Sequence, residues 1–401
     1  MMSRTYPTVL AAQGGPPVRT QAMPARKAFG ADELAMVEEV FRYYSEQDPG
    51  YQGHFEQLYC QEFCAAMGGG HADAVATGTA AVYVAIAALG LPSGSEVLVS
   101  PITDPGSVNA IIHAGLTPKL MDSAPGSYNV GPDQVALRIG PSTKAALIVH
   151  AAGQAAEIDA IVAQCHQRGV NVIEDCSQAH MARWNGRPVG TFGDIAAFST
   201  MYRKASITGA SGGVVYTRDQ SLYHMALAHA DRGKTPWIAG FNDKDPAQFL
   251  FPALNLHTDE LSCAVGIASW RRLPKTIAAR MTYVKGLDRL ATASRYCRPY
   301  GWHEGDSPFI YPIRVDIKRL PIAKTAFAEM VAGEGIGLNP HYLYLLADWP
   351  YLTPYLADTY ETPNARAIRD QSFNLFVNEK YGQQEIEDTI AAILKVEQMI
   401  G

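Results

Sequence analysis

The sequence predicts a doubly wound α/β domain, built on a mostly parallel seven-stranded sheet, followed by a smaller α+β domain. The first observation is that strand-like and helix-like segments alternate from residue 72 to about 216, the pattern of repeated βα units. The second is an apolar run over 145–149, which is typical of a parallel strand covered on both faces. The third is a change of pattern after about residue 275, which indicates a separate unit.

The N-terminal part is predicted to be an arm followed by two helices. Residues 1–30 are rich in Pro, Gly and Ala and show little periodicity, so we expect an irregular arm. Apolar positions at helical spacing begin at Ala31. A second helix is expected from Phe55 to Met67, where Gly68-Gly-Gly70 ends it. A loop containing Asp48-Pro-Gly50 separates the two helices.

The large domain is predicted to span residues 31–274 and to hold the sheet. Its strands are expected at 74–77, 96–100, 117–121, 144–150, 171–174, 195–199 and 213–216, and helices between them at 79–89, 107–114 and 158–168. A long aromatic loop follows over 234–256, and loops of this length inside enzymes are often functional. We expect this loop and the N-terminal arm to shape a substrate pocket.

The small domain is predicted to span residues 275–401. Two helices are expected around its junction with the large domain, over 258–272 and about 275–295. The segment 309–316 alternates as a strand does. Further helices are expected at 322–332 and 385–400.

The composition limits the partners and the location of the protein. Hydrophobic residues make up 47% and charged residues 18% of the chain, as in soluble globular proteins with a large core. The net charge of −6 argues against nucleic acid or an anionic membrane as the main partner. No apolar run reaches the roughly 18 residues that span a bilayer, and the first residues lack the apolar region of a signal peptide. We therefore expect a cytoplasmic protein.

The six cysteines are expected to be reduced thiols, because the chain is long and shows no signal sequence. Cys60 and Cys64 lie four residues apart on a predicted helix and share a face, and burial as small apolar residues is the favoured interpretation. The sequence contains neither a CxxC pair nor an HExxH motif, so we expect no zinc site.

Three segments predict a site for pyridoxal phosphate, which needs a lysine for a Schiff base, a carboxylate for its ring nitrogen and a cradle for its phosphate. Lys204 follows a predicted strand and precedes the glycine-rich turn 208–213. Asp175 ends an apolar strand, at the sheet edge where open α/β sheets bind ligands. Gly78 and Thr79 begin a helix, and helix N-termini bind phosphate.

Each segment also has a simpler interpretation. Lys204 can be a solvated surface lysine, and Asp175 can cap a helix that follows the strand. Capping alone also explains Gly78 and Thr79. The order and spacing of the three segments favour the cofactor site over these alternatives.

Together these segments resemble the DegT/DnrJ/EryC1/StrS family of sugar and cyclitol aminotransferases, which share the fold-type I, aspartate aminotransferase-like fold. The resemblance covers nearly the whole chain. It is carried by 77–81, 94–97, 149–153, 172–178, 189–194, 198–199, Lys204, 208–213 and 253–255.

The resemblance implies a role for each matching residue. Lys204 forms the Schiff base (aldimine), and Asp175 pairs with the ring nitrogen. The remaining cofactor contacts implied are Gln178 at the ring hydroxyl and Gly78, Thr79 and Ser199 at the phosphate. Asn255 matches an asparagine that reaches the phosphate of the neighbouring subunit, which implies a homodimer with shared active sites. The pair His341-Tyr342 matches a His-Tyr pair near the substrate pocket.

The sequence departs from the family pattern near the expected substrate. Asp104 stands where an aromatic residue usually stacks on the pyridine ring; it can instead face the substrate or cap the next helix. The turn after the lysine has Ala210-Ser211 in place of an acid, and the segment 231–234, which contains Arg232, lacks the common His-Gly. These differences allow an atypical amino acceptor.

The implied reaction is ping-pong amino transfer from glutamate or glutamine to a keto-sugar, keto-cyclitol or related carbonyl, in natural-product or surface-polysaccharide biosynthesis. Family dehydratases carry histidine at the lysine position, so Lys204 argues against that activity. Lyase, decarboxylase or aldol-type chemistry on the same fold stays open, as does a non-catalytic regulatory subunit that binds the cofactor.

Overall fold

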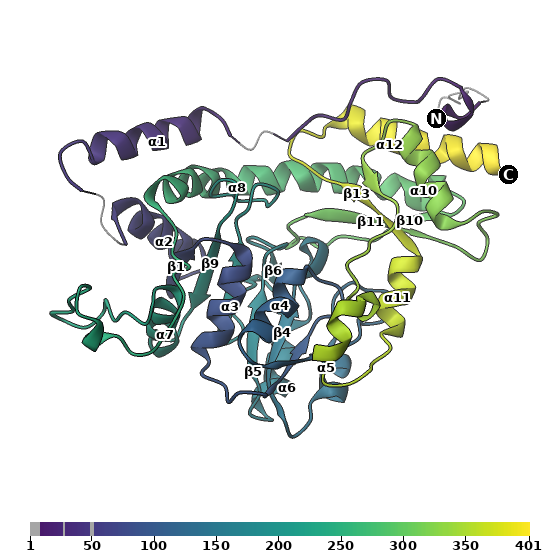
Figure 1. Cartoon of the computed structure of the whole chain (residues 1–401). Helices are drawn as coiled ribbons and strands as arrows, with labels where there is room; N and C mark the ends of the chain where they lie inside the picture. The colour runs from purple at the N-terminus through teal and green to yellow at the C-terminus, as the bar shows by residue number, and fades with distance from the viewer. Residues whose placement is uncertain (1–8, 27–28, 49–51) are drawn as a thin grey trace.

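A seven-stranded sheet forms the centre of the large domain in the computed structural model, which describes residues 9–26, 29–48 and 52–401 (Figure 1). The strand order is β1-β9-β8-β5-β4-β2-β3. All strands run parallel except β9, which is antiparallel to both of its neighbours. The bounds are β1 His71–Val75, β2 Glu96–Val99, β3 Thr117–Leu120, β4 Thr143–Val149, β5 Asn171–Asp175, β8 Ile195–Ser199 and β9 Gly213–Thr217. The predicted fold is therefore confirmed.

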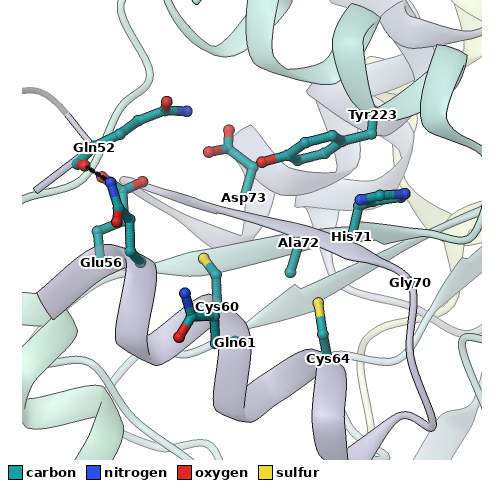
Figure 2. A pocket seen from close by; sticks show the side chains of 11 residues that line it. Gln52, Glu56, Cys60, Gln61, Cys64, Gly70, His71, Ala72, Asp73 and Tyr223 are labelled. Carbon is teal, nitrogen blue, oxygen red and sulfur yellow. Dashed lines mark hydrogen bonds between the residues drawn. The ribbon is translucent and has the colours of Figure 1, made fainter. Parts of the chain in front are cut away.

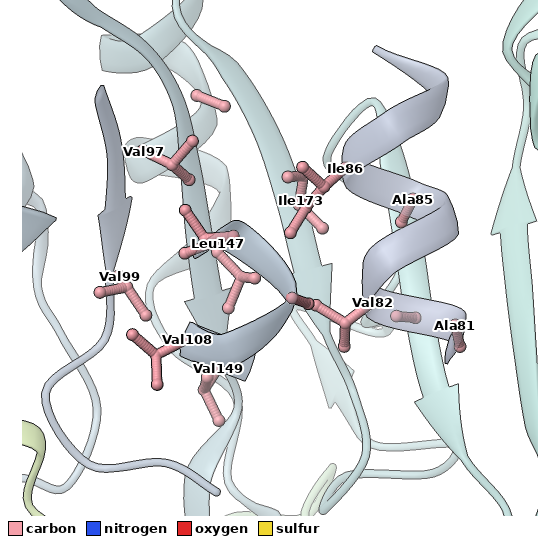
Figure 3. Close-up of a cluster of buried hydrophobic side chains, with 14 of the residues drawn as sticks. Ala81, Val82, Ala85, Ile86, Val97, Val99, Val108, Leu147, Val149 and Ile173 are labelled. Atoms are coloured by element: carbon pink, nitrogen blue, oxygen red, sulfur yellow. The ribbon is translucent and has the colours of Figure 1, made fainter. Parts of the chain in front are cut away.

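The apolar run in β4 is explained by its position, because β4 lies between β5 and β2 with helices over the sheet. Leu147 and Val149 of β4 pack with Val82 of α3 and Val108 of α4 (Figure 3). The helices of the large domain are α3 Gly78–Ala88, α4 Pro105–His113, α5 Pro132–Arg138, α6 Ile158–His166 and α7 Gln220–Ala230. The sequence patterns did not reveal α5, a seven-residue helix too short to show a period, or α7.

A long helix links the two cores and corrects one expectation. Instead of two helices there is one, α8, over Glu260–Gly286 with Pro274 inside it, followed by the short turns η4 Leu287–Arg289 and α9 Leu290–Ala293 (Figure 1). Proline removes one helical hydrogen bond, but packing on both sides of Pro274 holds the helix together. Leu273 packs in one core and Tyr283 in another. The predicted boundary between residues 274 and 275 thus falls inside a single helix.

The two predicted N-terminal helices are α1, Ala31–Tyr43, and α2, His54–Ala66. Both pack on α8. In the loop between them, Asp48 is described, while Pro49 and Gly50 lie outside the described residues.

The small domain contains a four-stranded antiparallel sheet in the order β10-β11-β13-β12. The bounds are β10 Cys297–Pro299, β11 Ile310–Val315, β12 Leu338–Asn339 and β13 Ser372–Phe376, with helices α10 Lys324–Gly333, α11 Pro363–Asp370 and α12 Gln383–Ile400. The expected strand at 309–316 and the expected helices at 322–332 and 385–400 are confirmed as β11, α10 and α12. A two-stranded hairpin of β6 Arg183–Trp184 and β7 Arg187–Pro188 completes the strands of the described chain.

The described part of the N-terminal arm, residues 9–26, is held against the small domain. Leu10 is buried in the small-domain core. The backbone N–H groups of Ala11 and Val18 each donate to the Glu334 carboxylate over 2.9 Å. Arg19 pairs with Asp388 at 2.7 Å. Polar contacts therefore fix a segment that has almost no regular structure; its first eight residues lie outside the described ranges.

All six cysteines are free thiols, as predicted. In the ranges that the structure describes, no helix is long and apolar enough to cross a bilayer.

Candidate active site

A cavity of about 420 Å³ lies where the strands of the large sheet end. Its walls come from the segments that follow β1, β5 and β8, from the start of α4, and from residues 309–310 and 342–344. It brings together eight of the eleven residues singled out by sequence: Gly78, Thr79, Asp104, Asp175, Gln178, Ser199, Lys204 and Tyr342. This edge is where open α/β sheets bind ligands.

Lys204 lies in the turn after β8, where its backbone N–H donates to the carbonyl of Met201 over 2.8 Å. Its Nζ is 4.7 Å from the centre of the Phe309 ring. Burial lowers the pKa of Lys204, while the charges of Asp175 and Asp104 oppose that shift. A lowered pKa increases the fraction of neutral amine, which is the nucleophilic form.

Asp175 is the last residue of β5, and only 4% of its surface is exposed. Its Oδ2 accepts a hydrogen bond from Ser107 Oγ at 2.8 Å, and its Oδ1 accepts from the Ser177 N–H at 3.0 Å. No helix begins here, so Asp175 is not the helix cap of the simpler interpretation. Its carboxyl group lines the same cavity as Lys204.

The adjacent Glu174 points to the other face of the sheet. Its carboxylate accepts hydrogen bonds from His150 Nε2 at 3.0 Å and from the N–H groups of Gly190, Phe192 and Gly193 at 2.6–2.7 Å. The Ala156 N–H donates to His150 Nδ1, which places the ring proton on Nε2. Cys176 adds a thiol to this buried group. Because these bonds already engage both His150 nitrogens and both Glu174 oxygens, we interpret the group as structural.

The first turn of α3 forms a cradle for an anion. Thr77 caps the helix by accepting from the Ala80 N–H at 2.8 Å, which leaves the first N–H groups directed at the cavity end of the helix. A Cβ on Gly78 would lie 2.4 Å from the Ser199 Cβ, and one on Gly106 would lie 2.5 Å from Thr79 Oγ1. A Cβ at either position would therefore force its neighbours to move. The resulting N–H and hydroxyl groups fit a phosphate.

Asp104 serves as a helix cap, one of the two alternatives left open for it, and also lines the cavity. Its Oδ1 accepts from the Gly106 N–H at 2.9 Å at the start of α4. The nearby aromatic wall is Tyr342, whose ring stacks on Tyr128 at 6.0 Å with 11° between the planes. Burial raises the pKa of Tyr342, and a hydrogen bond from Gln178 opposes the shift.

Three of the residues singled out by sequence lie outside the walls of this cavity. Asn255 is exposed, and its Oδ1 accepts from the His257 N–H at 3.3 Å. Arg232 has a left-handed backbone, with φ of 58°, and its side chain pairs with Asp231. His341 Nδ1 lies 3.1 Å from Lys324 Nζ.

Sequence patterns did not point to the residues that hold the Lys204 turn. The guanidinium of Arg26, in the N-terminal arm, donates to the carbonyls of Tyr202 and Ala205 over 3.2 Å each. These carbonyls lie on either side of Lys204. Arg26 also pairs with Glu379 at 3.3 Å. A lone arginine in an irregular arm carries no sequence signal for this role.

Glu379, the partner of Arg26, also pairs with a residue of α8 that contacts the segment at the cavity wall. Arg280 is 2% exposed, pairs with Glu379 at 3.0 Å and donates to the Pro308 carbonyl at 3.2 Å. The next residue is Phe309, whose ring lies against Lys204. The turn is therefore held from both sides by charged groups of the arm and the small domain.

The fold and this cavity define a class, the fold-type I enzymes that carry pyridoxal phosphate. An amine with a lowered pKa, a buried carboxyl group and an anion cradle share one cavity, and this donor set fits the three requirements of the cofactor.

The chain belongs to the DegT/DnrJ/EryC1/StrS aminotransferase family, whose profile matches residues 29–394. Its cofactor is pyridoxal phosphate. The match confirms the resemblance stated from the motifs.

Individual relatives agree with this placement. A Streptoalloteichus tenebrarius protein named as an L-glutamine:3-amino-2,3-dideoxy-scyllo-inosose aminotransferase is 34% identical over 56% of this chain and 54% of its own length. The chain thus spans about half of that relative. The spore coat polysaccharide biosynthesis protein SpsC of Bacillus subtilis is 28% identical over 84% of this chain and 88% of its own. The structure of an aminotransferase from Psychrobacter cryohalolentis is 26% identical, with a TM-score of 0.86 over 95% of this chain and all of the other.

Proposed function

We propose that the protein is an aminotransferase that moves an amino group from glutamate or glutamine to a keto-sugar, keto-cyclitol or related carbonyl. One observation carries the proposal: the Lys204 amine shares one cavity with the Asp175 carboxyl group and the cradle at Gly78. The names of the relatives support the substrate classes, since one refers to L-glutamine and an inosose and another to polysaccharide biosynthesis. Natural-product and surface-polysaccharide pathways both fit these names.

Different residues around the cavity are proposed to bind the phosphate and the ring of the cofactor. The N–H groups at Gly78 and Thr79 and the hydroxyl groups of Thr79 and Ser199 hold the phosphate. Asp175 supplies the negative charge that keeps the ring nitrogen protonated, and Ser107 orients that carboxyl group. When bound, pyridoxal phosphate supplies a ring that withdraws electrons from the reacting carbon of the substrate.

Lys204 is the proposed acid–base group. Its Nζ would hold the cofactor covalently and would be free to act on a proton once the amino donor is bound. The free Nζ then accepts a proton from the carbon that bears the donor's amino group and returns it during the transfer. Burial lowers the pKa of Lys204, which favours the neutral amine that this proton transfer needs.

The remaining predicted residues are proposed to act on the substrate or across a dimer. Asp104 and Tyr342 line the cavity and offer a carboxyl and a hydroxyl group to a polyhydroxylated acceptor. Asn255 is proposed to reach the phosphate in a second copy. His341 and Arg232 are proposed to approach the substrate from outside the walls of this cavity.

Exposed apolar groups around Asn255 support a homodimer. Ile238, Leu250 and Leu254 are each more than half exposed on the loop 234–256, which projects away from the molecule beside α7 (Figure 1). Mixing Lys204→Ala with Asn255→Ala tests the shared site. A mixed dimer regains one intact site, so activity above that of either variant alone is expected, while no recovery would contradict sharing.

The test of the proposed reaction is to convert the cofactor without an acceptor. Glutamate or glutamine is added to the cofactor-loaded protein, and the released cofactor is separated by chromatography. Stoichiometric pyridoxamine phosphate is expected from the wild type and none from Lys204→Ala. An unchanged cofactor with either donor would favour a regulatory role, and loss of donor carbon dioxide would favour decarboxylase chemistry.

A further inference from the structure

A second cavity, of about 380 Å³, lies at the free edge of β1. Residues of α2, β1 and α7 line it, and none of them lines the cavity around Lys204. Figure 2 shows the Asp73 carboxyl group and the Tyr223 side chain directed into this space, with Glu56 and Cys60 along α2. The strand explains the orientation, since Ala72 and Ala74 pack in a core cluster with α2 and alternate with His71 and Asp73.

Each carboxyl group of this cavity has one buried oxygen without a hydrogen-bond partner in the described part of the chain. Asp73 is 3% exposed, and its Oδ2 has no hydrogen-bond partner within the described part of the chain. Glu56 is 4% exposed; its Oε2 lies 3.2 Å from His257 Nε2, but its Oε1 also lacks a partner there. Buried polar atoms are nearly always hydrogen-bonded, and a buried carboxylate without a counter-charge is unfavourable. Burial and the charge of Glu56 both raise the pKa of Asp73.

The lining fits an organic cation better than a metal ion. It contains two acidic residues and no lysine or arginine, so it favours positive charge. Across the described ranges, the one cluster with three or more close metal-ligand atoms is the His150 group described above. Gln52 and Gln61 offer amide groups to hydroxyl partners, and Gln57 offers its amide oxygen, since its Nε2 donates to the Gln52 carbonyl at 2.8 Å. The rings of His71 and Tyr223 stack at 4.9 Å and 16°, which forms a flat wall.

We propose that this cavity binds a small hydroxylated primary amine, with Asp73 and Glu56 as its counter-charges and the His71–Tyr223 wall against its carbon skeleton. The choice of a hydroxylated amine rests on the proposed function, because an aminated sugar or cyclitol is the class of its product. The site is separate from the reacting groups, so its occupant is bound and not converted there.

The probes are glucosamine and glucose, which carry the same ring hydroxyl groups except that an ammonium replaces one of them. Calorimetric titration is made into the cofactor-loaded wild type, Asp73→Asn and Asp104→Asn. The first variant removes one of the two carboxyl charges of the second cavity with little change of shape, and the second removes one of the two carboxyl charges of the Lys204 cavity. Thermal unfolding and cofactor absorbance show that each variant is folded and loaded.

The wild type is expected to bind glucosamine more tightly than glucose. Asp73→Asn should bind glucosamine at least tenfold more weakly than the wild type does, and Asp104→Asn should bind it with the wild-type affinity. Equal binding by the two probes, or a loss confined to Asp104→Asn, would overturn the proposal. A shift of the dimer dissociation constant in Asp73→Asn without amine binding would also overturn it and assign the cavity to a second copy. The titration measures binding and not turnover, so its failure is distinguishable from failure of the proposed reaction.

Discussion

Replacing Gly78 with alanine tests the anion cradle without touching a titratable group. The new Cβ would lie 2.4 Å from the Ser199 Cβ, 2.6 Å from its Oγ and 3.0 Å from its Cα. Ser199 cannot move freely, because it is 7% exposed on a central strand and its N–H is bonded to Ser177 Oγ at 3.0 Å. Either α3 or β8 must therefore shift.

The sign of the expected effect is informative. Alanine is favoured over glycine inside helices by up to about 1 kcal/mol, whereas overpacking destabilises by about 1–3 kcal/mol. The Gly78 backbone does not have a positive φ, so strain arises from the contact alone. We expect lower stability, and a displaced cradle that weakens cofactor binding by about 5- to 150-fold, the affinity equivalent of an overpacking cost of about 1–3 kcal/mol.

The assay combines thermal unfolding with titration of the cofactor-free protein with pyridoxal phosphate. Gly333→Ala is the matched control, since a Cβ there meets nothing within 4 Å. This control should lower neither the thermal stability nor the affinity for the cofactor. Adding Ser199→Gly to Gly78→Ala removes the two nearest atoms, so stability should recover while affinity stays low. Wild-type affinity in Gly78→Ala would refute the cradle.

Three further predictions concern charged groups. Asp175→Asn should lower turnover about a hundredfold or more with the cofactor still bound, measured by steady-state kinetics. A wild-type rate would show that Asp175 has only a structural role, through its hydrogen bonds to Ser107 and Ser177. Arg26→Ala should lower kcat more than it raises KM, and should shift the pH titration of the cofactor absorbance at Lys204. The control Arg42→Ala, which changes an exposed arginine, should do neither. If the two variants behave alike, Arg26 does not hold the Lys204 turn. Lys204→Met should stabilise the cofactor-free protein at neutral pH, because the lowered pKa of Lys204 means that its partly buried cation destabilises the fold below the folded-state pKa. That gain should fade as the pH rises through the unfolded value of about 10.4, and chemical denaturation across pH would contradict the reasoning if the gain were constant.

The main sheet was predictable because its signals are local. The apolar run of β4 and the small residues before α3 identify a buried strand and a phosphate-binding turn without any knowledge of distant contacts. Lys204 and Asp175 could be assigned to one cavity because Asp175 ends β5 and Lys204 follows β8, and these strands are parallel neighbours in the same sheet. The capping role of Asp104 was one of two local alternatives, and the hydrogen bond to Gly106 selects it.

Other features depend on contacts between residues far apart in the sequence. The local sequence at Pro274 predicts the end of a helix. The continuity of α8 results instead from packing against both cores. The role of Arg26 depends on carbonyl groups that lie 176 and 179 residues away. The unpaired carboxyl group of Asp73 is visible only once burial and hydrogen bonds are known.

The central claim is that Lys204 is the residue that holds the cofactor. Borohydride reduction of the loaded protein, followed by proteolysis and mass spectrometry, tests it directly. The account predicts a pyridoxyl group on the peptide that contains Lys204, and none on that peptide from Lys204→Arg. A pyridoxyl group on another lysine of the wild type, or on none, would contradict it.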